Sequence, residues 1–185
     1  RRVKTTGRRR ASADHFQARF TWRDIDRVKS KLKIPLILKG IATAEDARIA
    51  VEHGVDAVYV SNHGGRQLDH GKGGLDVLPE VVEAIGGKAE IYVDGGFMRG
   101  TDIVKAMALG ANAVGIGRLQ GLAVAAAGEE GVVRMLELLA DEVTRCLGLL
   151  GVSSYGELDS SYLAKVDPIG RRAYASAFPL LDEGY

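Results

Sequence analysis

The segment YVSNHGGRQLD, residues 59–69, places an imidazole and a guanidinium on either side of two glycines. His63 can accept a proton near neutral pH, because an unperturbed imidazole has a pKa of about 6.5. Arg66 carries a permanent charge on a planar fork that can hold a carboxylate through two hydrogen bonds. Gly64 and Gly65 would let a flat ligand approach the backbone closely. A base beside a carboxylate clamp suits chemistry on the carbon next to a carboxylate. The spacing alone is equally compatible with a structural loop in which the histidine caps a strand.

Polar residues also follow two other apolar segments. Lys39 comes after the run 34–38 and would place a cation at the end of a strand, although a lysine there can also extend to solvent. Asp94 offers a carboxylate for hydroxyl groups. Gly95 and Gly96, which follow it, offer bare backbone N–H groups for an anion.

The same pattern recurs at Gly115, Gly117 and Arg118. Glycine-rich turns after the last strands of a barrel commonly hold phosphate. A phosphorylated cofactor, with its reactive end facing His63, therefore fits the positions that follow the last two apolar segments.

Strand-like and helix-like segments alternate from Thr21 onward and would position these residues. Short apolar runs predict four buried parallel strands, at residues 34–38, 56–60, 90–93 and 113–116. Six helices are expected from apolar spacing and end signals. The first four are one after Thr21 with Ile25, Val28 and Leu32 on one face; 44–53, capped by Thr43 and stopped by Gly54; about 77–85, with Pro79 in its first turn and Gly86–Gly87 at its end; and 102–109, capped by Thr101 and ended by Gly110.

The last two expected helices are a longer one, with an apolar stripe of Val133, Leu136, Ala140, Val143 and Leu147, and a short final one, with a capping box of Ser154 and Glu157.

This alternation predicts an α/β fold with a parallel sheet, either an open doubly wound sheet or a barrel. Functional-looking residues follow all four strands, which favours the (β/α)8 TIM barrel, where every strand opens onto one active-site face. A complete barrel needs about 250 residues and eight strands. We therefore expect the chain to supply the C-terminal half, the last four strand–helix units. The N-terminal half would come from the same precursor or from a second chain.

The expected organisation is a basic mobile arm or loop remnant at 1–20, the half barrel at 21–164, and a tail at 165–185. Six basic residues stand in the first ten, without the aromatic residues that a nucleic-acid platform would use. The net charge is +1, and no apolar run approaches the ~20 residues of a membrane helix. We expect no nucleic-acid partner, no membrane span and no metal site. Cys146 is the single cysteine and is expected to be a packed or half-buried thiol, as suits a reducing, cytoplasmic location.

SNHGGRQLD, with LKG before it and DGGFMRGTDIVKAMALGANAVGIGR after it, closely resembles the FMN-dependent α-hydroxy acid oxidases and dehydrogenases. That family includes glycolate oxidase, lactate oxidase and mandelate dehydrogenase. The resemblance runs from about Phe20 to about Leu163. It implies oxidation of an (S)-2-hydroxy acid to a 2-keto acid, with FMN as cofactor and either dioxygen or a quinone or protein as electron acceptor. We also expect a homo-oligomer, with the tetramer as the expected form.

The resemblance also implies roles for individual residues. His63 matches the catalytic base, which also contacts substrate and flavin, and Arg66 matches the residue that binds the substrate carboxylate. The residues matched to the cofactor site are Lys39 beside the flavin's pyrimidine edge, Ser61 as a flavin contact, Asp94 at the ribityl chain, and Gly95, Gly96, Gly117 and Arg118 around the phosphate. Phe97 and Met98 are also expected to bind the cofactor.

Met98 departs from the family's pattern, which has an arginine there, and losing that donor could weaken phosphate binding by about 1.5–3 kcal/mol. Leu119 replaces a proline that often follows Gly-Arg. The carboxylate that pairs with the histidine and the substrate-binding tyrosines belong to the family's other half. Two alternatives stay open: a barrel half that binds FMN or phosphate without turnover, and a barrel like the purine-nucleotide dehydrogenases, which need a cysteine on a loop.

Overall fold

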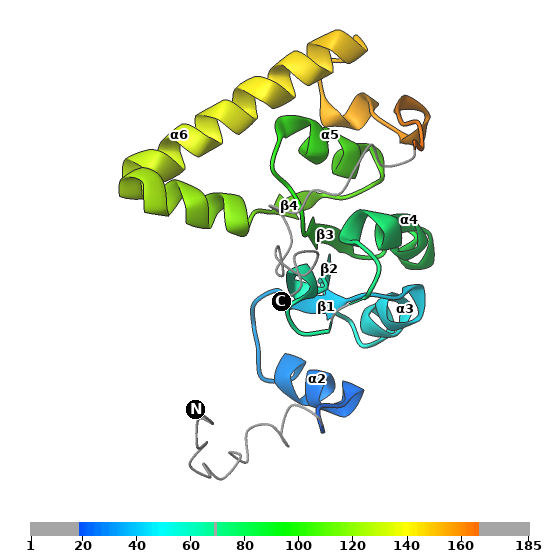
Figure 1. Ribbon diagram of the computed structural model, residues 1–185. Helices are drawn as coiled ribbons and strands as arrows, with labels where there is room; N and C mark the ends of the chain where they lie inside the picture. Colours follow the sequence, from blue (N-terminus) through cyan, green and yellow to red (C-terminus); the bar gives the residue numbers. More distant parts are fainter. Residues whose placement is uncertain (1–18, 69, 167–185) are drawn as a thin grey trace. The chain divides into compact units, whose positions relative to one another are not determined.

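The computed structural model describes residues 19–68 and 70–166 (Figure 1). The chain divides into two compact units, residues 1–34 and 35–185. The expected domain boundaries near residues 20 and 164 stay predictions, because most of the basic arm and of the tail lies outside the described residues. No helix in the described part of the chain is long and apolar enough to cross a bilayer.

The first unit contributes helix α2 (Trp22–Lys29). The predicted start at Thr21 is confirmed, because the Thr21 N–H and hydroxyl both donate to the Asp24 carboxylate at 2.9 Å. The helix ends earlier than predicted. Ser30 donates its hydroxyl to the Arg27 carbonyl, and Leu32 lies beyond the last turn.

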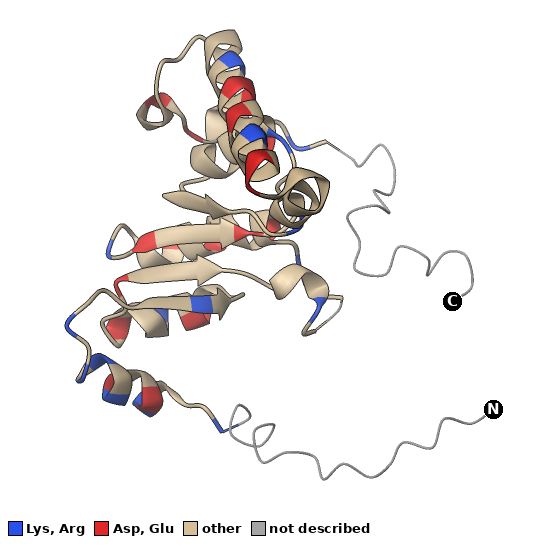
Figure 2. Cartoon of the chain, turned by 90° about the vertical axis from the view of Figure 1, so that its left-hand side faces the viewer, with Lys and Arg blue, Asp and Glu red and all other residues tan. Residues whose placement is uncertain are grey.

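The second unit contains a sheet of four parallel strands: β1 (Ile37–Ile41), β2 (Ala57–Val60), β3 (Glu90–Asp94) and β4 (Ala113–Gly115). Their spatial order is the order of the chain, and they point the same way (Figure 2). Helices α3 (Ala44–Glu52), α4 (Gly74–Ile85) and α5 (Gly100–Ala108) connect consecutive strands, and α3 and α4 lie on the same side of the sheet (Figure 1). Sequential order with repeated βα units is the arrangement of a barrel segment. It brings the carboxyl ends of all four strands to one edge.

The strand register divides the side chains between two faces of the sheet. Val58 and Val60 are fully buried with Val93 and the α4 residues Leu78 and Val81. The opposite face carries Lys39, Tyr59 and Tyr92, which lie side by side on three neighbouring strands. In a closed barrel the face away from the helices is the interior. The polar residues of the strands therefore lie on the interior face.

The first strand is shifted from its predicted place at residues 34–38. Ile34 is 69% exposed, and β1 begins only at Ile37. Pro35 has no N–H to donate, and the Leu36 N–H donates to the Asp56 side chain at 2.7 Å. Lys39 consequently lies inside β1 and not after it.

Two helix starts also differ from the predictions. Helix α4 begins at Gly74, so Pro79 lies in its second turn. Pro79 is exposed, and its missing N–H removes one hydrogen bond of the helix. Helix α5 begins at Gly100 and not after Thr101, because the Asp102 carboxylate accepts from the backbone N–H groups of Met98 and Arg99 at 3.2 and 3.1 Å. The predicted ends are confirmed: Gly54, Gly86 and Gly110 all have positive φ.

The last two predicted helices are corrected as well. The segment after Ser154 forms only a 3₁₀ turn, η2 (Tyr155–Glu157), because the backbone is already extended at Leu158. The Glu157 carboxylate accepts hydrogen bonds from both Ser153 and Ser154 at the start of this turn. A second 3₁₀ turn, η3 (Ser160–Tyr162), follows it.

Helix α6 (Arg118–Leu150) bends at Ala127–Gly128, where both residues leave helical geometry (Figure 1). Its predicted apolar stripe is not the buried face: Val133 and Leu136 are about half exposed, whereas Met135 and Leu139 are buried.

Contacts with α5 explain why the buried face of α6 is not the predicted one. The Gly100 N–H donates to Glu142 at 2.7 Å, and the Arg99 guanidinium pairs with the same carboxylate at 2.6 Å. These donors lower the pKa of Glu142, so the pair's contribution to stability is lost as the pH falls through that lowered pKa. Residues 135, 139 and 142, spaced by four and three, therefore share the face turned toward α5.

Changing Gly100 to alanine is expected to destabilise the complete protein by about 1–3 kcal/mol. The added Cβ would stand 2.5 Å from the Glu142 Cβ and 2.6 Å from the Val143 backbone nitrogen, so α5 and α6 would have to separate. Gly148→Ala is the matched control, because no atom lies within 4 Å of its Cβ position and alanine should stabilise α6 by about 0.5–1 kcal/mol. Urea denaturation measures both changes. Equal stability of Gly100→Ala and the parent would contradict the close approach.

Candidate active site

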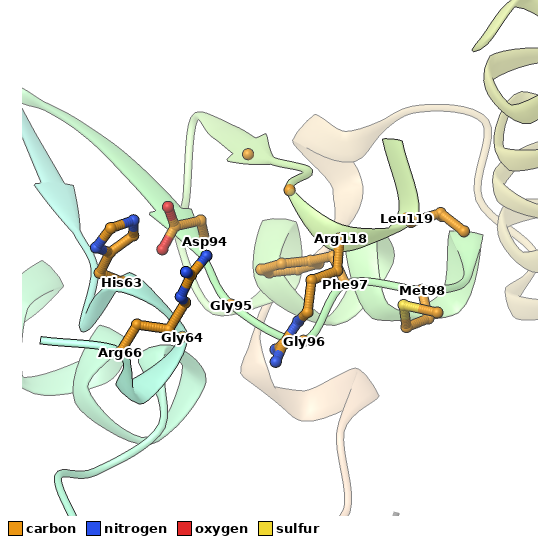
Figure 3. Close-up of a pocket in the computed structure, with 12 residues that line it drawn as sticks. His63, Gly64, Arg66, Asp94, Gly95, Gly96, Phe97, Met98, Arg118 and Leu119 are labelled. Carbon is orange, nitrogen blue, oxygen red and sulfur yellow. The ribbon is translucent and has the colours of Figure 1, made fainter. Parts of the chain in front are cut away.

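A cavity of about 550 Å³ lies at the carboxyl ends of β2, β3 and β4 (Figure 3). The residues that line it are His63, Gly64, Arg66, Asp94, Gly95, Gly96, Phe97, Met98, Gly115, Gly117, Arg118 and Leu119. His63, Arg66 and Asp94 lie toward one end, and Met98 and Leu119 toward the other. The structure therefore brings most of the predicted site residues to one place.

Lys39 ties three strands together on the interior face of the sheet. Its Nζ donates to the Ser61 Oγ at 2.6 Å and pairs with the Asp94 Oδ2 at 2.5 Å. The same nitrogen lies 4.4 Å from the centre of the Tyr59 ring, at a distance suited to a cation–π contact. The ammonium of Lys39 is thus held in one place between β1, β2 and β3.

Lys39 and Ser61 line a second cavity, of about 980 Å³, with His63 at its boundary. This cavity lies among the β1–α3 loop, helix α4 and the loop after β2, and its lining is largely apolar. The predicted site residues are therefore distributed over two cavities that share His63, and only Lys39 and Ser61 lie outside the first.

Asp94 has one carboxylate oxygen that the described residues leave without a partner. Its Oδ2 pairs with Lys39, whereas its Oδ1 is buried and accepts no hydrogen bond. A buried acceptor without a donor is costly, so this oxygen marks a place for a hydroxyl or amide group.

Tyr59 packs against this pair and was not among the predicted site residues. Burial, and then the neighbouring Asp94 carboxylate, raise the pKa of Tyr59. Its hydroxyl fills the space that a Cβ on Gly115 would take, which explains the glycine there. The alternation along β2 could have revealed Tyr59, because Val58 and Val60 face the helices and the residue between them must face the interior.

His63 begins a tight turn, η1 (His63–Gly65), which Ser61 and Asn62 separate from the end of β2. The His63 N–H donates to the Ser61 Oγ at 3.1 Å, so this hydroxyl accepts from both His63 and Lys39. The imidazole Nδ1 lies 3.1 Å from the Gln67 side-chain amide. His63 and Arg66 are both exposed and leave the same turn, so both can reach a ligand in the cavity.

Glycines and one guanidinium, groups that could bind an anion, form another part of the cavity lining. Gly95 and Gly96 have φ of 103° and 83°, which residues with a side chain rarely adopt, and both are exposed. Arg118 begins α6 and lies beside Gly64, with its Nη2 3.7 Å from the place a Cβ there would take. Phe97 is 5% exposed and Met98 is half-buried, so these two contribute apolar surface.

These groups fit the chemistry of FMN. The unpaired Asp94 oxygen can accept from a ribityl hydroxyl, and the bare N–H groups of Gly95 and Gly96 with Arg118 can hold a phosphate. Lys39 can stand beside a ring that becomes negatively charged.

A family model described as FMN-dependent dehydrogenase matches residues 1–165. The chain belongs to this family. Membership confirms the predicted resemblance, and with it the α/β barrel fold and FMN as the family's cofactor. The purine-nucleotide dehydrogenase alternative is thereby dropped, and Cys146 is a half-buried residue of α6.

Known members of the FMN-dependent dehydrogenase family are closely similar to the chain. It is 48% identical to the L-lactate oxidase of Nostoc sp. (strain PCC 7120 / SAG 25.82 / UTEX 2576) over 82% of this chain and 41% of that protein. It is also 48% identical to the 4-hydroxymandelate oxidase of Amycolatopsis orientalis over 79% of this chain and 42% of that protein. The chain thus spans about two fifths of the length of these relatives.

Solved structures of mandelate oxidase match the fold. One, with benzoyl-formic acid, aligns with a TM-score of 0.72 at 49% identity and covers 74% of this chain and 41% of that one. Another, a variant with a monooxide FMN adduct, also aligns with a TM-score of 0.72 at 49% identity and covers 74% of this chain and 44% of that one. The four parallel strands of the second unit are therefore part of a (β/α)8 barrel, as predicted.

Proposed function

We propose that the chain is the C-terminal part of an FMN-dependent enzyme that oxidises an (S)-2-hydroxy acid to a 2-keto acid. The observation that carries this proposal is that His63 and Arg66 leave one turn and line one cavity with Asp94 and Arg118. Relatives named as lactate, 4-hydroxymandelate and 2-hydroxyacid oxidases support the substrate class.

In this proposal each residue has a chemical task. Arg66 holds the substrate carboxylate through two hydrogen bonds and fixes the 2-carbon in place. His63 takes one proton from the substrate as its two electrons leave. Bound FMN would accept those two electrons together with the substrate's second proton. Lys39, held by Ser61 and Asp94, places a positive charge where negative charge accumulates.

Reduction of the flavin by substrate tests the proposal. The complete protein should show flavin absorption bands that glycolate, lactate or mandelate bleaches under anaerobic conditions. Colour that none of a broad set of 2-hydroxy acids bleaches would contradict it and leave a barrel that binds FMN without turnover. A protein that takes up no FMN would contradict the cofactor assignment.

The electron acceptor and the surroundings of the enzyme are further parts of the proposal. The names of the relatives, all oxidases, favour dioxygen over a quinone or protein acceptor, and fast return of colour on admission of air tests this. A homo-tetramer in the cytoplasm remains our expectation, although two relatives, from Oryza sativa subsp. japonica and Arabidopsis thaliana, are named as peroxisomal.

Changing Met98 to arginine is expected to tighten FMN binding by roughly tenfold to a hundredfold, because a charged donor would be added to the phosphate end of the cavity. Titration of the apoprotein by quenching of FMN fluorescence measures the affinity. Met98→Leu is the control, since it changes the shape of the side chain without adding a donor. Equal affinities of the parent and Met98→Arg would show that Arg118 and the backbone N–H groups already satisfy the phosphate.

A further inference from the structure

The turn that carries His63 and Arg66 has an unfavourable backbone conformation. Three consecutive residues have positive φ: His63 at 55°, Gly64 at 64° and Gly65 at 74°. Glycine adopts such angles freely, but a residue with a Cβ does so only when its surroundings compensate. Some neighbouring group must therefore hold His63 in this conformation.

Among the described residues, the side chains of Ser61 and Asn62 accept hydrogen bonds from backbone N–H groups of the turn. Ser61 accepts from the His63 N–H, and the Asn62 Oδ1 accepts from the Gly64 N–H at 2.9 Å. The same Asn62 amide donates from Nδ2 to the Lys72 carbonyl at 3.0 Å. One half-buried side chain thus connects the start of the loop after β2 to Lys72, two residues before α4.

Asn62 also lies between the ends of two strands. Its Oδ1 is 3.9 Å from the place a Cβ on Gly95 would take, so the amide stands beside the turn that follows β3. Arg66 is coupled to His63 through the backbone, because its N–H donates to the His63 carbonyl at 3.3 Å. A rotation of the peptide between His63 and Gly64 would therefore redirect both the imidazole and the guanidinium.

We infer that Asn62 is a positioning residue, which aims His63 and Arg66 at the substrate by clamping the Gly64 N–H and the Lys72 carbonyl on one amide. This role rests on the proposed function of the two side chains. It predicts a combined effect: loss of the clamp should lower kcat through the base and raise KM through the arginine. Asn62 does not line the cavity of about 550 Å³, but it lines a smaller cavity with Gly95 and Gly96 and the second cavity with Lys39. FMN affinity is therefore measured in each variant, to separate weaker cofactor binding from misplacement of His63 and Arg66.

Three variants of the complete protein separate positioning from general stability. Asn62→Ala removes both hydrogen bonds, whereas Asn62→Asp keeps an acceptor for the Gly64 N–H and loses the donor to Lys72. Asn112→Ala is the matched control, because the Asn112 Oδ1 likewise accepts from a backbone N–H, that of Ile91 at 2.8 Å, away from the cavity.

The expected results differ between these variants. Asn62→Ala should lower kcat/KM about tenfold or more, with both constants changed, and Asn62→Asp should recover much of that loss. Asn112→Ala should lower the melting temperature by a similar amount to Asn62→Ala and leave kcat and KM unchanged. Kinetic constants of Asn62→Ala that match the parent would overturn the inference, as would an equal kinetic loss in Asn112→Ala. If Asn62→Ala does not fold, the test uses Asn62→Asp. Values of kcat and KM equal to the parent's, in a variant whose Gly64 amide exchanges faster than in the parent, would overturn the positioning role.

Hydrogen exchange of the Gly64 amide gives a readout that needs no turnover. It should be slow in the parent and faster in Asn62→Ala, and equal rates would overturn the clamp. A parent that reduces its flavin with no 2-hydroxy acid would instead refute the proposed function, and the exchange rates would still decide what Asn62 holds.

Discussion

The His63→Ala variant should reduce its flavin with a 2-hydroxy acid about 10²–10⁴ times more slowly than the parent, while keeping its FMN. The imidazole is the group placed to take the substrate proton, and its backbone is held by Ser61 whatever side chain stands there. Stopped-flow absorbance under anaerobic conditions measures the rate of reduction, and the absorbance ratio of flavin to protein measures retention of the cofactor.

His53→Ala is the matched control for this prediction. His53 caps α3 at its C-terminal end and does not line either of the two cavities described above, so its loss should leave the reduction rate unchanged. Reduction of His63→Ala at the parental rate would show that another group removes the proton. Loss of FMN from this variant would show that the imidazole mainly holds the cofactor.

The second large effect is expected at Arg66. Replacing it with leucine should raise the KM for the hydroxy acid by about tenfold to a hundredfold or more, because each hydrogen bond to a charged group is worth about 1.5–3 kcal/mol. The KM of Arg66→Lys should lie between the values of the parent and of Arg66→Leu, since an ammonium keeps the charge without the planar fork. Steady-state kinetics across substrate concentrations measure the change.

Two comparisons decide whether the effect at Arg66 arises from the carboxylate. Arg48→Leu removes a guanidinium from the surface of α3, where its ion pair with Glu52 is 4.0 Å long, and should leave KM unchanged. The amide of the same hydroxy acid has no carboxylate, so it should bind the parent weakly. Its KM should be the same in the parent and in Arg66→Leu. An unchanged KM in Arg66→Leu would place the carboxylate elsewhere.

Much of the fold could be predicted from local patterns. Apolar runs located β2, β3 and β4 to within a residue or two, and the glycines at 54, 86 and 110 marked helix ends because a positive φ is needed there. The errors came from interactions between distant residues. Asp56 takes the N–H before β1, and Glu142 draws a different face of α6 toward α5, and neither contact leaves a periodic signal in the sequence.

The candidate site was predictable in its residue types more than in its geometry. Carboxyl ends of parallel strands meet at one edge, so His63, Asp94 and Arg118 were expected together. The interior alternation that brings Tyr59 beneath Lys39, and the amide of Asn62 that clamps the turn, depend on strand register and loop conformation. The residues that would complete the substrate site could not be placed, because the chain spans about two fifths of the relatives' length.

A crystal structure of the complete protein with FMN and a 2-keto acid tests the central claim most directly. It should show the Arg66 guanidinium bound to the acid's carboxylate by two hydrogen bonds of about 2.7–2.9 Å. A ring nitrogen of His63 should lie within about 2.6–3.2 Å of the 2-oxygen, on the same side of the flavin. An acid bound away from this turn, or an imidazole directed out of the cavity while Arg66 holds the carboxylate, would contradict the assignment.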